Sequence, residues 1–226
     1  MSKRLGVLTI GEAPRADDTV GELRQVLGPA YAIVERGALD GLTRVEIAEL
    51  APRPGEYVLI TLLADGTSVT LGKPRILARV QQQIDAFVGD GVDAILLLCT
   101  GTFPEFKSER LIVQPQPVLY HLVLGLAGAG RTIGVLTPLA AQIGQARAKW
   151  RDYGVDPVVA AASPYLEGDE VTPAVREVTE RGADLIFMDC MGYSLPMKAQ
   201  ARAAAGGRSV ILARSAVARV LAEITE

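Results

Sequence analysis

The sequence predicts an α/β protein with two pseudo-symmetric lobes, each a parallel sheet flanked by helices. Short apolar runs alternate with helical segments along 226 residues, which is typical of parallel sheets joined by right-handed crossovers. Residues 91–101 and 182–192 align without a gap and share a glycine, an aspartate, a cysteine and a second glycine. Gly-Val-Leu-Thr occurs in both 5–10 and 133–138. We therefore expect one α/β unit to occur twice.

Composition and charge exclude several classes of protein. The chain is 49% apolar, 22% charged and 5% aromatic, with a net charge of −3, which fits a soluble α/β protein. This balance gives no basic footprint for nucleic acid or for a membrane surface. The apolar run at 5–10 is too short for a signal peptide, and no run reaches the roughly 18 apolar residues of a membrane span. We expect a cytoplasmic protein with two reduced cysteines.

Prolines, glycines and capping residues mark the elements of the first half. Lys3–Ile10 is predicted to be a buried strand, and Pro14 to begin a helix that runs to about Leu27. The capping box Thr43–Glu46 opens a short helix. Asp65-Gly66 predicts the turn of a hairpin. The other predicted elements are strands at 31–35, 57–63, 67–71 and 111–113, the apolar run before Cys99, and a helix at 74–88.

The second half repeats this alternation. Pro138 is predicted to begin a helix reaching about Tyr153, and Thr172-Pro173 to cap the helix that leads to Gly182. The first copy of the unit is longer, mainly between residues 37 and 73. We expect a first lobe of residues 1–116 plus 207–226, and a second lobe of 117–206. The other predicted elements are strands at 155–160 and 209–213, the apolar run before Cys190, and helices at 117–127, 196–205 and 215–224.

The two cysteines are the main functional clue, because Cys99 and Cys190 end equivalent strands. Ligands of parallel sheets bind beyond the carboxyl ends of the strands. Lobes that face one another would place the two thiols on opposite walls of one cleft, with the sulfurs roughly 6–8 Å apart around a substrate. One thiolate can then take an α-proton while the other thiol protonates the opposite face. Backbone N–H groups at the strand ends would favour the thiolate and hold a carboxylate.

This arrangement resembles the aspartate/glutamate racemase superfamily, which includes hydantoin racemase, maleate isomerase and arylmalonate decarboxylase. The chain resembles the AroM family more closely, over nearly its whole length. The resemblance implies the two-lobed racemase-like fold, and the presence of both cysteines favours two-sided chemistry. The motifs that carry it are Leu8-Thr-Ile-Gly-Glu-Ala-Pro-Arg15, Gly37-Ala-Leu-Asp-Gly-Leu42, Leu62-Leu-Ala-Asp-Gly-Thr67, Cys99-Thr-Gly-Thr102 and Met188-Asp-Cys-Met-Gly192.

Asp189 is the third catalytic candidate. It directly precedes Cys190, whereas Leu98 precedes Cys99. One interpretation is that Asp189 assists proton transfer at Cys190, where an ionised carboxylate would favour the protonated thiol. The other is that it anchors a loop through hydrogen bonds.

The substrate-binding candidates lie at predicted strand ends or in the extra segment of the first half. Arg15 either holds a second substrate carboxylate in a bidentate fork or is solvated. Glu12 is a candidate for a substrate ammonium, and Tyr193 either closes over the ligand or caps the next helix. The full set is Gly11, Glu12, Arg15, Thr67, Thr100, Gly101, Thr102, Thr137, Gly192 and Tyr193.

The leading hypothesis is a cofactor-independent racemase or epimerase acting on a small carboxylate-bearing substrate. Two alternatives stay open: an isomerase or decarboxylase that uses one cysteine, and a small-molecule-binding protein without turnover. His121 is the only histidine, and the chain has no metal-ligand spacing, P-loop or dinucleotide fingerprint, so no metal or cofactor is expected. We expect neither nucleic acid nor membrane as a partner, and a homodimer is a fold-level expectation.

Overall fold

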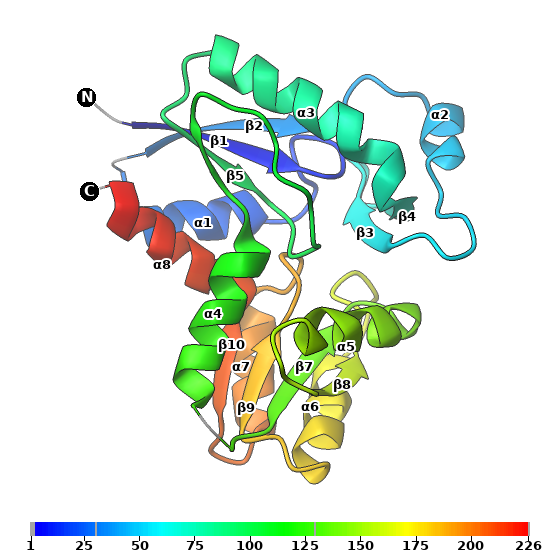
Figure 1. Cartoon of the computed structure of the whole chain (residues 1–226), viewed down its shortest axis with the longest axis vertical. Coiled ribbons are helices and arrows are strands. Elements are labelled where there is room, and N and C mark those ends of the chain that lie inside the picture. The colour runs from blue at the N-terminus through cyan, green and yellow to red at the C-terminus, as the bar shows by residue number, and fades with distance from the viewer. Residues whose placement is uncertain (1–2, 30, 129, 226) are drawn as a thin grey trace. The chain divides into compact units, whose positions relative to one another are not determined.

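The structure, a computed structural model, describes residues 3–29, 31–128 and 130–225. Strands and helices alternate along the chain (Figure 1). In chain order they are β1 (Lys3–Thr9), α1 (Thr19–Leu27), β2 (Tyr31–Gly37), α2 (Arg44–Glu49), β3 (Val58–Leu62), β4 (Ser68–Gly72), α3 (Lys73–Gly89), β5 (Ala94–Leu97), β6 (Leu111–Val113), α4 (Pro115–Ala127), β7 (Ile133–Thr137), η1 (Ala140–Gln142), α5 (Ile143–Arg151), β8 (Val158–Ala161), α6 (Val171–Glu180), β9 (Leu185–Met188), α7 (Leu195–Ala204), β10 (Ser209–Leu212) and α8 (Ala213–Thr225).

Two parallel sheets of the same topology form the framework of the described residues. The first has the strand order β2-β1-β5-β6 and the second β8-β7-β9-β10. In the first sheet, β1 pairs with β2 and β5, and β5 pairs with β6. In the second sheet, β7 pairs with β8 and β9, and β9 pairs with β10. The predicted fold class is therefore confirmed, and β5 and β9, which precede the cysteines, are equivalent strands.

The aspartate shared by the two aligned stretches has the same role in both units. The Asp93 side chain accepts a hydrogen bond from the Arg4 N–H, and the Asp93 N–H donates to the Arg4 carbonyl. Asp184 makes the same pair of bonds with Thr132. Each aspartate thus ties the start of one central strand to the start of its neighbour.

The glycine of the repeated Gly-Val-Leu-Thr motif allows a helix to pack closely on the sheet. A Cβ on Gly6 of β1 would lie 2.8 Å from the ring of Phe87 in α3. A Cβ on Gly134 of β7 would lie 2.8 Å from Ala183 and 3.0 Å from Val178 of α6. In the first unit, α1 and α3 cover opposite faces of the sheet (Figure 1). The repeated glycine is therefore a packing requirement of this layered arrangement.

The extra segment of the first unit forms the predicted hairpin and capped helix. β3 and β4 pair antiparallel around the Asp65-Gly66 turn. Thr43 and Glu46 make both bonds of the capping box at the start of α2, since each side chain accepts the backbone N–H of the other.

The chain divides into two compact units whose limits differ from the predicted lobes. The first unit runs to Pro115 and resumes at Ala218, and the second covers Gln116–Val217. The return to the first unit was expected at 206/207, but it lies within α8. The reason is that β10 pairs in register with β9, which places this last strand in the second sheet.

Three helices begin later or are capped differently from the prediction. α5 begins at Ile143, after η1, and not at Pro138. α1 begins at Thr19, not at Pro14, because the preceding residues form a loop held by the Asp17 side chain. α6 begins at Val171, and the side chain of Asp169, not Thr172, accepts a hydrogen bond at its first turn. In α1 and α6, a side-chain contact competes with the local capping signal.

Candidate active site

The first cysteine lies on the loop that follows β5. Cys99 is partly buried, and its Sγ accepts a hydrogen bond from the Gly101 N–H at 3.4 Å. A Cβ on Gly101 would lie 2.8 Å from Leu59 of β3 and 3.4 Å from the Cys99 sulfur. A glycine at this position therefore lets the loop turn its N–H toward the sulfur while it packs against β3.

The hairpin of the first unit supports the Cys99 loop. The Thr102 N–H donates to the Tyr57 hydroxyl at 3.3 Å. The Lys73 ammonium lies 4.5 Å from the centre of the Tyr57 ring, where burial lowers the pKa of Lys73. Tyr57 is not among the predicted site residues, although it contacts the loop that carries four of them.

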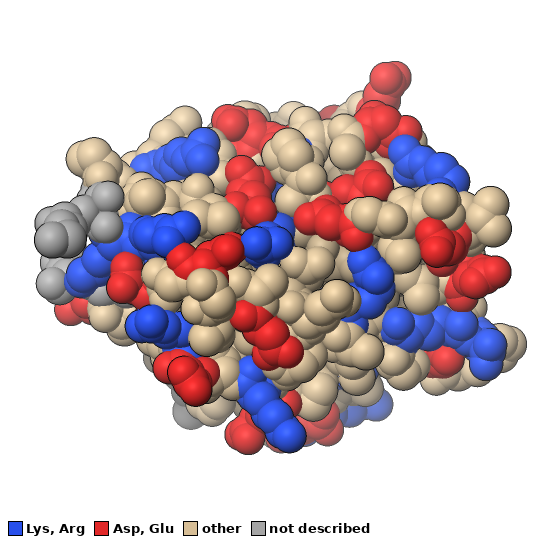
Figure 2. Space-filling model, turned by 90° about the horizontal axis from the view of Figure 1, so that it is seen from above, with Lys and Arg blue, Asp and Glu red and all other residues tan. Residues whose placement is uncertain are grey.

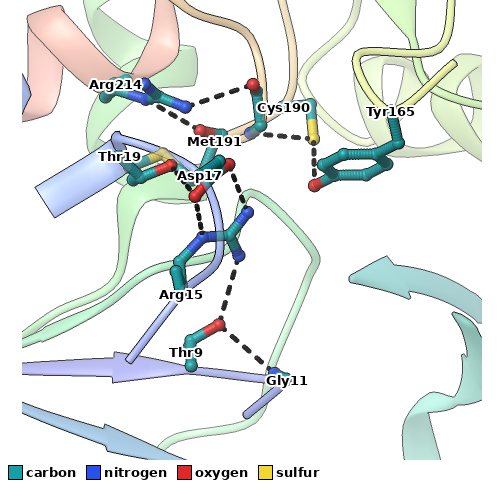
Figure 3. Close-up of polar contacts among 10 residues, drawn as sticks. Thr9, Gly11, Arg15, Asp17, Thr19, Tyr165, Cys190, Met191 and Arg214 are labelled. Carbon is teal, nitrogen blue, oxygen red and sulfur yellow. Dashed lines mark hydrogen bonds and ion pairs between the residues drawn. The ribbon is translucent and has the colours of Figure 1, made fainter. Parts of the chain in front are cut away.

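The second cysteine repeats the geometry of the first. Cys190 follows β9 and is 9% exposed, and its Sγ accepts a hydrogen bond from the Gly192 N–H at 3.3 Å. The Tyr165 hydroxyl lies 3.8 Å from the same sulfur (Figure 3). In both units, therefore, the sulfur accepts the N–H of the glycine two positions further along the chain.

A buried arginine holds the backbone beyond Cys190. Arg214 of α8 is 2% exposed. Its Nε donates to the Met191 carbonyl at 2.9 Å and its Nη2 to the Gly192 carbonyl at 3.1 Å (Figure 3). These two bonds fix the direction of the peptide groups that follow the cysteine.

Asp189 faces a polar cluster formed with α4 and α5. Its Oδ2 accepts hydrogen bonds from the Tyr120 hydroxyl at 2.7 Å and the Lys149 ammonium at 3.0 Å. Tyr120 also stacks on Trp150, with ring centroids 4.1 Å apart. Burial, and next the negative charge of Asp189, raise the pKa of Tyr120 well above its ordinary value. These contacts describe a loop anchor, and assistance to Cys190 stays a prediction.

Tyr193 points into the core of the second unit. It is fully buried, and its hydroxyl donates to the Ala162 carbonyl at 2.5 Å. Burial, and next the proximity of Cys190, raise the pKa of Tyr193 well above its ordinary value. The adjacent Ser194 caps α7 by accepting the Met197 N–H. The tyrosine hydroxyl at the Cys190 sulfur thus comes from Tyr165, not from Tyr193.

The junction between β1 and α1 is a network of side-chain hydrogen bonds (Figure 3). The Thr9 hydroxyl accepts from the Gly11 N–H at 3.2 Å and from Arg15 Nη1 at 3.3 Å. Arg15 also binds both carboxylate oxygens of Asp17, each at 2.8 Å. The Arg15 guanidinium, predicted either to hold a substrate carboxylate or to be solvated, therefore binds a carboxylate of the chain itself.

Glu12 and Thr67 serve the hairpin turn in this structure. Glu12 Oε2 accepts the Ala64 N–H at 2.7 Å, and the Glu12 N–H donates to the Leu62 carbonyl at 3.3 Å. Thr67 is exposed, and its N–H donates to Asp65. Glu12 thus ties the end of β3 to the loop after β1.

The remaining candidates lie at strand ends. Thr100 is buried on the Cys99 loop. Thr137 ends β7, and its carbonyl accepts the Ala162 N–H. The carbonyl of Thr9, at the equivalent end of β1, accepts the Ala38 N–H in the same way. Its hydroxyl lies 3.5 Å from Gln142 Oε1.

The predicted residues lie on two loops of the first unit and near Cys190 in the second. In the first unit, Cys99, Thr100, Gly101 and Thr102 share a loop, and Gly11, Glu12 and Arg15 share another. In the second unit, Cys190 and Gly192 lie together with Tyr165. Tyr165 lies on the loop after β8, where none of the predicted site residues lies, although the rule that ligands bind beyond the strand ends applies equally there.

Surface charge, possible metal ligands and helix hydrophobicity do not narrow the class of ligand further. Lys and Arg side chains are interspersed with Asp and Glu on the face shown in Figure 2. Among the described residues, no three His, Cys, Asp or Glu side chains are grouped as a metal ion requires. None of the described helices combines the length and apolar character of a membrane span.

Solved structures with a similar fold include three racemases. Glutamate racemase from Aquifex pyrophilus is 16% identical, with a TM-score of 0.57 over 99% of this chain and 84% of that one. Picrophilus torridus aspartate racemase is 15% identical, with a TM-score of 0.57 over 98% and 94%. Allantoin racemase from Pseudomonas fluorescens is 16% identical, with a TM-score of 0.59 over 98% and 89%. At this identity the likeness establishes the fold.

Comparison with curated proteins finds no match. The family model described as AroM protein matches residues 5–225, which is nearly the whole chain. The chain therefore belongs to the AroM protein family and has the fold of the aspartate/glutamate racemases.

Proposed function

We propose that this protein is a cofactor-independent racemase or epimerase of a small carboxylate-bearing substrate, with Cys99 and Cys190 as its acid/base pair. One observation carries the proposal. After the equivalent strands β5 and β9, each cysteine sulfur accepts the N–H of the glycine two residues further along the chain, at 3.4 Å for Cys99 and 3.3 Å for Cys190. A hydrogen bond donated to sulfur stabilises the thiolate, which is the form that removes a proton.

The proposed step is redox-neutral. The thiolate of one cysteine forms an S–H bond with the α-proton, and the electron pair left on carbon is delocalised into the substrate carboxylate. The other thiol then transfers its proton to the opposite face of the same carbon, which inverts its configuration. The thiol and the thiolate have exchanged places at the end, so the reverse reaction restores the starting enzyme. We place the substrate carboxylate at the loops after the cysteines, where Thr100 and Thr102 supply hydroxyl groups.

The surroundings of the two thiols favour a division of roles between them. Asp189, with its partners Tyr120 and Lys149, precedes Cys190, and Tyr165 contacts its sulfur, whereas the apolar Leu98 precedes Cys99. This difference keeps a one-cysteine isomerase or decarboxylase as the second candidate.

Solvent exchange tests the proposal directly. The protein is incubated in deuterium oxide with a panel of small amino and hydroxy acids, and deuterium at the α-carbon and enantiomeric composition are measured by NMR and chiral chromatography. A racemase incorporates deuterium and inverts at least one substrate. Cys99→Ala and Cys190→Ala should each reduce inversion by at least about 1000-fold, because each variant lacks the acid or base for one face.

The exposed strand substitution Thr70→Ala is the matched control and should leave inversion unchanged. Loss of turnover in only one cysteine variant would favour the one-cysteine reaction. Ligand-induced thermal stabilisation without exchange across the panel would favour a binding protein. Inversion that persists in the double cysteine variant would contradict the proposal.

A further inference from the structure

The loop that carries Tyr165 is anchored at its base. The Ser163 N–H donates to Glu170 at 2.7 Å, just before α6, and the Tyr165 N–H donates to the Ser163 hydroxyl at 3.2 Å. Ser163 itself is 7% exposed. The segment between β8 and α6 therefore presents Tyr165 from a backbone that is held on both sides, which reduces the entropy lost when its side chain is positioned.

The Tyr165 hydroxyl lies against two residues of the Cys190 loop, Cys190 itself and Gly192. Its hydroxyl lies 3.8 Å from the Cys190 sulfur, within hydrogen-bond reach for sulfur. A Cβ added to Gly192 would collide with the same hydroxyl. Gly192 therefore provides both the N–H that faces the sulfur and the space that the tyrosine occupies. Both of these contacts at the sulfur therefore depend on the same glycine.

The other polar groups near Cys190 in the second unit have different partners. The Tyr193 hydroxyl donates its proton to the Ala162 carbonyl, and Glu170 accepts the Ser163 N–H. Asp189 pairs with Lys149, whose positive charge offsets the effect of the carboxylate on the adjacent cysteine. Arg214 contributes a positive charge beside the carbonyls of the same loop. The carboxylate that precedes Cys190 is therefore paired with a cation, and the Tyr193 hydroxyl is engaged by the Ala162 carbonyl.

We infer that Tyr165 is a positioning residue for Cys190: its hydroxyl donates to the sulfur and stabilises the thiolate. The inference rests on the proposed function, in which Cys190 exchanges a proton with the substrate. It assigns Tyr165, a residue outside the predicted set, to the stabilisation of the Cys190 thiolate by a side chain, in addition to the backbone N–H of Gly192.

Alkylation tests this inference without a substrate. Iodoacetamide is applied from pH 5 to pH 10, and the alkylation rates of the Cys190 and Cys99 peptides are followed separately by mass spectrometry. In Tyr165→Phe, the pH midpoint of Cys190 alkylation should rise by about one unit, because a hydrogen bond to a charged group is lost. Gly192→Ala, which displaces the tyrosine, should shift the Cys190 midpoint in the same direction. The Cys99 midpoint should remain where it is in the parent protein.

Tyr153→Phe is the matched control, because it removes another tyrosine hydroxyl of the second unit, one that accepts from Gln116. It should leave the Cys190 midpoint unchanged. An unchanged Cys190 midpoint in Tyr165→Phe, or equal shifts of both cysteines, would overturn the inference. Alkylation requires no turnover. If the Cys190 midpoint shifts in Tyr165→Phe but the parent protein exchanges no deuterium into any acid of the panel, only the proposed function is overturned.

Discussion

At the scale of single residues, the second unit carries a buried ion pair beside its cysteine. The side chains of Lys149 and Asp189 are 10% and 1% exposed, and the Tyr120 hydroxyl completes the group. Removing water from both charges is costly, so the pair depends on good geometry and on its additional hydrogen bond. Truncating either charged partner would leave the other buried and uncompensated. The cluster thus fixes the end of β9 immediately before Cys190.

Tyr120 makes the unfolding free energy of the protein depend on pH above about 10. Its pKa is raised in the folded protein, so the unfolded chain loses the proton first as pH rises above about 10. The stabilisation from the neutral hydroxyl is therefore complete below pH 10 and is lost above it. In Tyr120→Phe, the fall of the unfolding free energy with pH should be shallower by about 1.4 kcal/mol per pH unit. Urea titrations from pH 8 to 11 measure this slope, and an equal slope in both proteins would refute the assignment.

At the scale of elements, the hairpin β3–β4 supports the first cysteine. Leu59 packs against Gly101, and the Tyr57 hydroxyl accepts the Thr102 N–H. On the other side of the hairpin, the Ala64 N–H binds Glu12. The segment that lengthens the first unit therefore connects its two candidate loops, the one after β1 and the one after β5.

Tyr57→Phe should loosen the Cys99 loop selectively. Without an acceptor for its N–H, the Thr102 amide should exchange with solvent deuterium about 2- to 10-fold faster, because a neutral hydrogen bond is lost. Amide exchange followed by NMR provides the measurement. The Gly192 amide, which serves the other cysteine, is the internal control. Unaltered exchange at Thr102 would show that the hairpin does not hold the loop.

At the scale of the whole molecule, one topology is used twice. Both sheets have the same strand order, and a glycine in each central strand lets a helix pack against it. The chain passes from the first unit to the second at the start of α4 and returns within α8. The duplication accounts for the equivalent positions of the two cysteines.

Equivalent glycines should therefore have equivalent effects on stability. Gly6→Ala and Gly134→Ala each place a methyl group 2.8 Å from a buried side chain, which should lower the unfolding free energy by about 1–3 kcal/mol. Gly144 of α5 has nothing within 4 Å of an added Cβ, so Gly144→Ala should raise it by about 0.5–1 kcal/mol. Chemical denaturation of the three variants measures these changes. A destabilised Gly144→Ala, or a neutral Gly134→Ala, would contradict the packing argument.

The sequence by itself determined the parts that depend on short-range patterns. The apolar runs, the Asp65-Gly66 turn and the Thr43–Glu46 capping box were predicted from neighbouring residues, and the structure has each of them. The equivalent strands before Cys99 and Cys190 were predicted from the likeness of two such local patterns. Backbone preferences and hydrophobic periodicity act over a few residues, so a single sequence is enough to reveal them.

Only the tertiary structure decided which side chains meet. Asp189 is paired with Lys149 and Tyr120, and Tyr165, not Tyr193, faces the Cys190 sulfur. The placement of β10 in the second sheet likewise depends on its pairing with β9. These partners are far apart in the chain, and their selection depends on the packing of whole elements, which no local pattern encodes.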